Sequence, residues 1–279
     1  MGVIVALTIK EAMRRRAFLG TLIILVTLYG LSFLPRAFKE AFGGDERQFE
    51  LGVNIAVLFG IDAIKFFSAV LAILLSAGAI TAEIERGYLA AILPRPIYRW
   101  ELYLGKWLGV MLFSAANATL WTGMLWVSVV LQGEPRVEMW RALPYVLLYP
   151  VLYGTLAFAL SSFLSASLAS MFTVALGAFA YFADHFLRPI AAFFDVRLLQ
   201  QMIWLSEWAL PMATLKRLVQ RQVDTILPPG MGDRPRFGRP EELEFLNPSV
   251  QPFDIAYVGL YILTAAAVGI VIFWRRDVQ

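Results

Sequence analysis

The sequence predicts an all-α polytopic membrane protein. We expect six transmembrane helices, an amphipathic interfacial helix at the N-terminus, a short cytoplasmic helix after the second span, and a long external loop before the last span. Hydrophobic residues make up 59% of the 279 residues and charged residues only 16%, whereas soluble domains average about 45–50% and about 25%. The apolar residues form uninterrupted runs of about the 20 residues that a helix needs to cross a bilayer. Lys and Arg residues gather on alternate sides of these runs.

The same composition excludes several other classes of protein. The helices of a soluble fold would each need a polar face, and the strands of a membrane β-barrel would alternate over about 10 residues. The chain has no Cys and one His, which excludes a disulfide scaffold, a cysteine metal site and most His-dependent catalysis. A net charge of +3 is too balanced for a nucleic-acid partner. We therefore expect one membrane domain over residues 1–279.

The six spans follow from the positions of the charges. Residues 142–183 include no charged side chain, and one helix of that length would measure about 63 Å, roughly twice the bilayer core. The stretch must therefore hold two helices, and the Ser-rich segment from Ser161 to Ser170 is the expected turn between them. The expected spans are residues 17–34, 58–82, 107–131, 143–164, 168–187 and 255–274.

The basic residues predict how the chain is oriented. With the N-terminus inside, ten Lys and Arg residues fall on short inner segments and five on short outer loops, so both termini are expected in the cytoplasm. Residues 1–16 place Val3 and Leu7 mostly opposite Lys10 and Arg14, which predicts an amphipathic helix in the inner interface. A plain basic anchor is the alternative. The first apolar run is too long for a cleavable signal peptide.

The external loop covers residues 188–254. Apolar and basic residues mix in two stretches, around Leu198–Leu205 and Leu215–Arg221, and these predict one or two amphipathic helices on the outer surface. The segment Pro228–Pro240 is rich in Pro, Gly and Arg, which predicts irregular structure.

The most informative segment is the cytoplasmic loop after the second span. Charged residues at 83–86 close the span, the apolar stretch Tyr88–Leu93 follows Gly87, and Pro94 and Pro96 end it. A helix this short is not stable alone in water, and its apolar side chains need a partner. A docking element for a cytoplasmic protein is one interpretation, and a structural cap over the protein's own helix ends is the other.

This loop resembles the cytoplasmic loop of the ABC-2 type transporter permeases. That family shows an acidic pair, Gly-Thr-Leu-Glu, two apolar residues, Ser-x-Pro-Val-Ser-Arg and a closing Gly-Lys. Glu83 and Glu85 stand for the acidic pair, whereas Tyr88, Ala90 and Pro94 depart from the pattern at its Thr, Glu and Ser. The matching or conservatively substituted positions are Gly87, Leu89, Ile92, Leu93, Pro96, Ile97, Arg99, Glu101, Gly105 and Lys106. The resemblance also covers the N-terminal helix, the six spans, the inner termini and the long last loop.

The resemblance implies a permease subunit of an ABC transporter in the plasma or inner membrane. It would pair with a second permease, identical or related, as a homodimer or a heterodimer. Two copies of a separate ABC ATPase would bind ATP and Mg, since this chain carries no GxxxxGK[ST] phosphate loop and is expected to bind no cofactor itself. Export by alternating access is the expected activity, and a non-transporting scaffold or regulator that binds an ABC ATPase is the alternative.

In such a permease the short cytoplasmic helix would be the coupling helix that the ATPase pushes. No residue is assigned to substrate binding. The expected ATPase-coupling residues are Glu83, Glu85, Arg86, Gly87, Tyr88, Leu89, Ile92, Leu93, Pro96 and Arg99.

Two pairs of charged residues lie near the expected outer ends of spans. Asp62 and Lys65 are one helical turn apart, which predicts a local ion pair, with a substrate-gating role as the alternative. Asp184 and His185 predict a cap or a snorkelling pair that reaches water, with a functional intramembrane site as the alternative. A Ser–His hydrolase is disfavoured because the serines of residues 165–170 lie about 22–30 Å from His185 along the helix.

Overall fold

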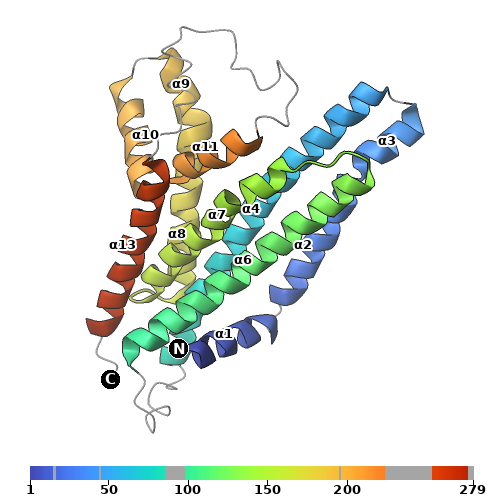
Figure 1. Cartoon of the computed structure of the whole chain (residues 1–279). Helices are drawn as coiled ribbons and strands as arrows, with labels where there is room; N and C mark the ends of the chain where they lie inside the picture. Colours follow the sequence, from blue (N-terminus) through green and yellow to red (C-terminus); the bar gives the residue numbers. More distant parts are fainter. Residues whose placement is uncertain (15–16, 44, 86–97, 195, 224–252, 276–279) are drawn as a thin grey trace.

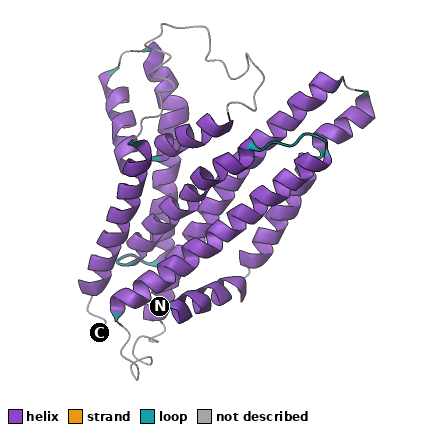
Figure 2. Ribbon diagram, viewed as in Figure 1, coloured by secondary structure: helices purple, strands orange, loops and turns teal. Residues whose placement is uncertain are grey.

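The computed structural model describes residues 1–14, 17–43, 45–85, 98–194, 196–223 and 253–275. Over these ranges the chain forms helices and no strand, as Figure 1 and Figure 2 show. The helices are α1 (Gly2–Arg14), α2 (Ala17–Ser32), α3 (Leu34–Phe42), α4 (Glu46–Glu85), α6 (Arg99–Leu131), α7 (Glu138–Ser161), α8 (Ala166–Phe182), a π-helical turn (Ala183–Leu187), α9 (Arg188–Phe193), α10 (Arg197–Ala209), α11 (Met212–Val223) and α13 (Asp254–Arg275).

Six segments of the described chain are long and apolar enough to cross a membrane, which confirms the predicted number of spans. They are Leu19–Ala41, Glu46–Ala79, Trp100–Leu131, Glu138–Ser161, Ala166–Ala191 and Asp254–Arg275. Figure 1 places α1, the last turn of α13, the end of α4 and the start of α6 at one end of the bundle, which we call the terminal end. The helices α3, α9 and α10 lie at the opposite end.

The second span is longer than the sequence predicts, because α4 begins at Glu46, twelve residues before the expected start. The first turns of α4 pack against the rest of the protein and are not an isolated, solvent-exposed helix. Val57 is fully buried in the core. Arg136, which precedes α7, donates to Asn54 Oδ1 at 3.1 Å and pairs with Glu50 at 3.3 Å. These contacts satisfy the polar residues that made the segment look like a loop.

Two further spans are assembled from more than one helix. The first combines α2 with α3, and Pro35 stands at the start of α3. The fifth combines α8, the π-helical turn and α9, and reaches Ala191. The predicted Ser-rich turn is confirmed, since α7 ends at Ser161 and the Ser165 hydroxyl caps α8 by accepting from the Leu168 amide at 3.5 Å.

The centre of the bundle is formed by α4, α6 and α7, and α4 makes its most extensive contact with α7. Gly154 allows this approach, because a Cβ there would lie 2.6 Å from Met111 Cε and 3.1 Å from Ala72 Cβ. On α6, the buried Trp121 donates its indole N–H to the Thr21 carbonyl of α2 at 3.3 Å. Small residues and buried hydrogen bonds therefore hold the spans together, as membrane helices require.

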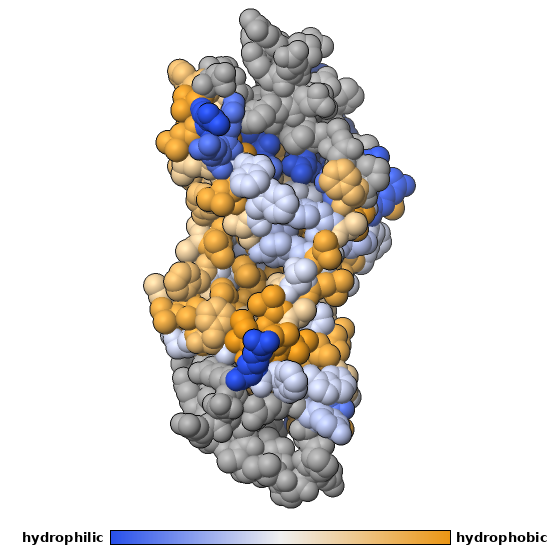
Figure 3. Space-filling model, turned by 90° about the vertical axis from the view of Figure 1, so that its left-hand side faces the viewer, coloured by the Kyte–Doolittle hydropathy of each residue, from blue (hydrophilic) through white to orange (hydrophobic). Residues whose placement is uncertain are grey.

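The described part of the external loop lies at the opposite end of the bundle. It forms α10 and α11, in agreement with the predicted amphipathic helices, and α11 packs mainly on α7 through buried Leu215, Leu218 and Val219. The segment Pro228–Pro240 falls outside the described residues. On the face drawn in Figure 3, hydrophobic residues cover the middle and most hydrophilic ones gather toward the opposite end.

Candidate functional site

The predicted coupling residues belong to the connection between α4 and α6 at the terminal end. Glu83 and Glu85 lie in the last turns of α4, and Arg99 is the first residue of α6. The structure therefore brings both flanks of the connection to the end of the bundle that also carries α1 and the last turn of α13 (Figure 1). The other predicted coupling residues, Arg86, Gly87, Tyr88, Leu89, Ile92, Leu93 and Pro96, lie outside the described residues.

Lys106 ties the two flanks together. Its side chain lies in the second turn of α6, the residue is only 5% exposed, and its ammonium donates to the Ala79 carbonyl of α4 at 2.7 Å. A hydrogen bond from a charged donor in a low-dielectric site is stronger than a neutral one. The start of α6 is thus fastened to α4 about two turns before α4 ends.

Two glycines of α6 allow α1 to pack closely against it. A Cβ on Gly105 would lie 2.9 Å from Ile4 Cβ, and a Cβ on Gly109 would lie 2.7 Å from Thr8 Cβ. The pair has the spacing of the small-xxx-small pattern that lets membrane helices approach closely. Thr8 is buried in this contact and donates its hydroxyl to the Ile4 carbonyl at 2.8 Å. The N-terminal helix is therefore packed on the start of α6.

The side of α1 away from α6 carries both apolar and charged residues. Val3, Leu7 and Met13 are all more than half exposed, and Lys10 is exposed on the same side, so the expectation that Lys10 lies opposite Val3 and Leu7 is wrong. Such a face fits the boundary between lipid headgroups and acyl chains.

Tyr103 extends the contacts of this end to two more spans. The side chain is fully buried on α6 and meets the Phe158 ring of α7 edge-on at 4.8 Å and the Phe273 ring of α13 at 5.8 Å. Aromatic pairs at these distances stabilise helix contacts beyond simple burial. The first turns of α6 therefore contact α1, α4, α7 and α13 at once.

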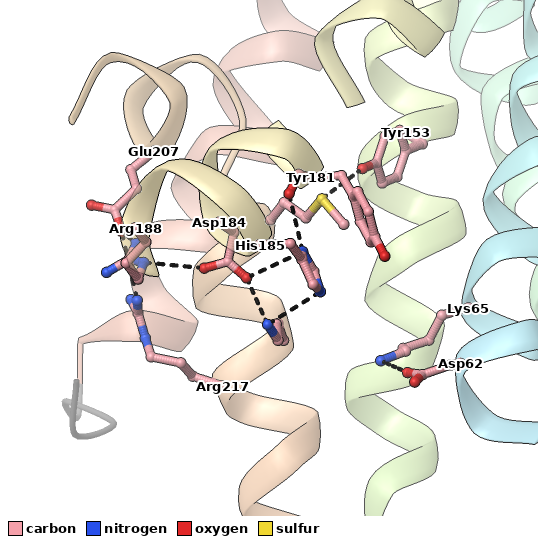
Figure 4. A network of polar contacts seen from close by, with 11 residues as sticks. Asp62, Lys65, Tyr153, Tyr181, Asp184, His185, Arg188, Glu207 and Arg217 are labelled. Carbon is pink, nitrogen blue, oxygen red and sulfur yellow. Dashed lines mark hydrogen bonds and ion pairs between the residues drawn. The ribbon is translucent and has the colours of Figure 1, made fainter. Parts of the chain in front are cut away.

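A second polar site lies at the opposite end, around Asp184 in the π-helical turn. Figure 4 shows Asp184 between His185 and Arg188. The Asp184 side chain is 10% exposed, with one oxygen 2.8 Å from Lys216 Nζ of α11 and the other 3.2 Å from Arg188 Nε. The expectation that Asp184 snorkels to water is therefore wrong, because the tertiary fold supplies its counter-ions.

His185 completes the attachment of Lys216. Its Nδ1 lies 3.0 Å from the Tyr181 carbonyl and its Nε2 lies 3.3 Å from Lys216 Nζ. Because a lysine ammonium only donates, Nε2 accepts in this arrangement and Nδ1–H donates to the carbonyl. The ring also stacks on Tyr181, with ring centres 3.9 Å apart.

Arg188 connects the ion-pair cluster around Asp184 to α10. It forms an ion pair with Glu207, and Arg217 of α11 lies 3.7 Å from the same carboxylate. Tyr257 and Tyr261 of α13 donate to the carbonyls of Glu207 and Ala209, at 3.1 Å and 2.6 Å. The corner between α10 and α11 is therefore held by the π-helical turn and the start of α9 on one side and by α13 on the other.

Sequence reasoning missed most of this cluster. Lys216, Arg217 and Glu207 lie far from Asp184 in the sequence, and nothing local to them indicates an intramolecular partner. The one available signal was the basic side of the amphipathic stretch that became α11.

The Asp62–Lys65 ion pair is confirmed, with Lys65 Nζ 2.5 Å from Asp62 Oδ1. Asp62 lies about 24 Å along α4 from its first residue, Glu46. The apolar segment Glu46–Ala79 is about 51 Å long, longer than the bilayer core of about 30 Å. The place of the pair near the outer start of the second span therefore stays a prediction.

The described residues include no group of three or more His, Asp or Glu side chains placed to hold a metal ion. No curated protein matches the chain in sequence. The sequence profile of the family described as ABC-2 family transporter protein matches residues 3–278.

Proposed function

This chain belongs to the ABC-2 family of transporter proteins, and on that premise we propose that a separate ABC ATPase drives it through the connection between α4 and α6. The chain is a membrane permease subunit of an ABC transporter. Two ATPase subunits would serve two permease chains, one on each. ATP and Mg would be held by the ATPase.

The observation that carries this proposal is the packing of the helices that flank the connection. Lys106 fastens α6 to α4, and Tyr103 contacts α7 and α13. Rigid, packed helices can transmit a displacement applied at one end. A push on residues 86–97 would therefore reach α4 and α6 directly and α1, α7 and α13 through contact. The two permease chains would then alternate between inward-facing and outward-facing arrangements and export the substrate.

The coupling residues remain those that the sequence indicates, and Leu89 and Leu93 are the apolar positions best suited to test them. We expect Leu89→Asp and Leu93→Asp to reduce the ATPase activity of the assembled transporter at least tenfold while the chain still inserts in the membrane. An aspartate there would have to be desolvated in an apolar docking cleft. The control is Val137→Asp, which replaces an exposed apolar residue at the opposite end of the molecule.

The measurement uses the full chain with an affinity tag, purified in mild detergent together with its ATPase. ATP hydrolysis is measured before and after reconstitution in vesicles. An ATPase that co-purifies and works equally well with Leu93→Asp would contradict the proposal. Stimulated hydrolysis without any substrate flux would instead favour the non-transporting regulator.

A further inference from the structure

A cavity of about 580 Å³ lies between α2, α3 and α4, and we call it the α3 cavity. Its volume is within the range of about 300–1,000 Å³ that small-molecule pockets occupy. Leu31, Phe38 and Phe59 form part of its wall and are 41%, 59% and 59% exposed, so the cavity is open along its side. At its inner end α4 lies directly on α6, because a Cβ on Gly60 would be 2.4 Å from Leu125 Cδ2.

The cavity is apolar at one end and polar at the other. Leu28, Gly60 and Leu125 line the end farther from the turn between α3 and α4, whereas Lys39 and Gln48 line the end beside this turn. Gln48 and Gly60 are about 18 Å apart along α4. A molecule that matches this order over that length has an apolar chain and a polar headgroup.

The charges near the turn place the polar end of the cavity at the level of lipid headgroups. Residues 36–47 include three cationic and three anionic side chains, and charged side chains are costly within the hydrocarbon of a bilayer. From that level, about 18 Å reaches through roughly one leaflet, because the hydrocarbon core is about 30 Å thick. The cavity therefore has the depth of one lipid, and the balanced charge favours a zwitterionic headgroup over an anionic one.

Lys39 and Glu46 present a cation and a carboxylate at the polar end in a fixed order. Lys39 Nζ lies 2.5 Å from Glu46 Oε2 and 4.7 Å from the centre of the Phe49 ring. The Lys39 side chain is 34% exposed and the Glu46 side chain is 77% exposed, so the cation lies nearer the apolar wall than the carboxylate does. An ammonium has several N–H donors and a carboxylate has several acceptor sites, so both groups keep capacity for a headgroup.

We propose that the α3 cavity binds a phospholipid with a phosphoethanolamine headgroup. An acyl chain would lie against the apolar wall, the phosphate would accept from Lys39, and the ammonium would donate to Glu46. In such a lipid the phosphate lies between the acyl chains and the ammonium, which is the order of the two side chains. A choline headgroup has no N–H group to donate to Glu46, and a glycerol headgroup has no cation to pair with it. Lipid binding here goes beyond the proposed function and does not depend on coupling to an ATPase.

Native mass spectrometry of the full chain, purified in mild detergent, counts the lipids that bind. Dioleoyl phosphatidylethanolamine, phosphatidylcholine and phosphatidylglycerol are titrated separately. We expect the first phosphatidylethanolamine on each chain to bind at a concentration at least tenfold lower than either of the other lipids needs. Equal affinity for the three lipids would overturn the proposal.

Two variants alter the cavity and its cation, and each has a matched control. Ala56 lies on the wall, so Ala56→Phe fills the cavity, whereas Ala116→Phe makes the same change at an exposed position of α6. Lys39→Met removes the partner of the phosphate, whereas Arg36→Met removes a cation of the same helix whose side chain is 53% exposed. We expect Ala56→Phe and Lys39→Met to weaken phosphatidylethanolamine binding at least tenfold. The two controls should weaken it less than twofold.

Glu46→Ala tests the partner of the lipid ammonium. It should bring the affinities for phosphatidylethanolamine and phosphatidylcholine within twofold of each other, because neither headgroup then has this carboxylate to pair with. A tenfold preference for phosphatidylethanolamine that persists in Glu46→Ala would contradict the proposed headgroup contact and overturn the assignment of this lipid.

The unaltered chain provides a second test, which also serves if Ala56→Phe does not accumulate. Phosphatidylethanolamine with a photoreactive group at the end of one acyl chain should label residues 28–31 and 56–60 in preference to Leu260 and Leu263 of α13, which are 61% and 67% exposed. Equal labelling of α13 would overturn the proposal. Lipid binding that persists in Ala56→Phe while the pairing of two chains is lost would assign the cavity to a second copy of this chain, and would overturn the proposal as well.

Discussion

Lys106 and Asp184 are charged residues that the fold keeps away from water by different means. The Lys106 ammonium bonds a backbone carbonyl of α4, whereas the Asp184 carboxylate is surrounded by cationic side chains from its own turn and from α11. A buried charge that loses its partner is strongly destabilising, because its desolvation is then uncompensated. A substitution at either position is therefore expected to lower the stability of the protein.

Asp184→Ala should lower the free energy of unfolding by about 1.5–3 kcal/mol, since it removes the carboxylate that binds Lys216 and one of the two carboxylates that pair with Arg188. The unfolding of the purified complex in detergent, followed by tryptophan fluorescence, measures this loss. Glu40→Ala is the control, because its ion pair with Arg36 is more than half exposed on both sides and such pairs contribute less than about 1 kcal/mol. Equal losses in the two variants would refute the idea of a buried cluster.

Lys106→Met keeps the length of the side chain and removes its charge and its hydrogen bond. We expect a loss of about 1.5–3 kcal/mol, the usual range for a hydrogen bond to a charged group, and a weaker attachment of α6 to α4. Lys10→Met, on the exposed side of α1, should change stability by less than about 0.5 kcal/mol. The chemical denaturation midpoints of Lys106→Met and Lys10→Met, measured side by side, test this difference in stability.

Among whole elements, α1 is the one whose position depends most directly on small residues. Ile4 and Thr8 pack where Gly105 and Gly109 leave the α6 backbone uncovered. The amphipathic pattern of residues 1–16 predicts a helix on a surface, but it does not say which surface. The pattern could not reveal that a partner helix offers two glycines one turn apart, because the match exists only in the folded chain.

Gly109→Ala should therefore displace α1, since the new Cβ would meet both Thr8 Cβ, at 2.7 Å, and the Val5 carbonyl, at 3.2 Å. Overpacking of this kind costs about 1–3 kcal/mol. Gly123→Ala on the same helix meets only Trp140, at 3.8 Å, and should leave stability unchanged or slightly raised. A thermal midpoint that falls for Gly123→Ala as much as for Gly109→Ala would contradict this reading of the contact.

For the molecule as a whole, the contact among α4, α6 and α7 holds the bundle together. Gly154→Ala would place a methyl group 2.6 Å from Met111 Cε and 3.1 Å from Ala72 Cβ. We expect the thermal midpoint of the complex to fall by several degrees, as an overpacked core of about 1–3 kcal/mol implies. Gly259→Ala, where a Cβ would meet nothing within 4 Å, should leave the midpoint in place.

The sequence was sufficient for the number of spans because runs without charge can only be buried in lipid or protein. It was not sufficient for the length of α4. Glu50 and Asn54 read as loop residues until Arg136, more than 80 residues away, supplies their partner. The Asp184 cluster escaped prediction for the same reason, since Lys216 lies 32 residues further along the chain. A local sequence pattern shows where the polar residues are, but only the folded structure shows which of them pair with each other.

The π-helical turn has a consequence for chain length at this site. The Arg188 amide bonds the Ala183 carbonyl five residues earlier, so the turn holds one residue more than an α-helical turn would. The extra residue is accommodated within the turn, so the helix that follows keeps the rotation that an uninterrupted α-helix one residue shorter would give it. Deleting the exposed Phe186 should therefore replace the π-helical turn by an α-helical one and leave Arg188 on the side of the fifth span that faces Glu207. Deleting one residue from the middle of α8, where no extra residue can be given up, would instead rotate the two parts of the span by about 100° relative to each other.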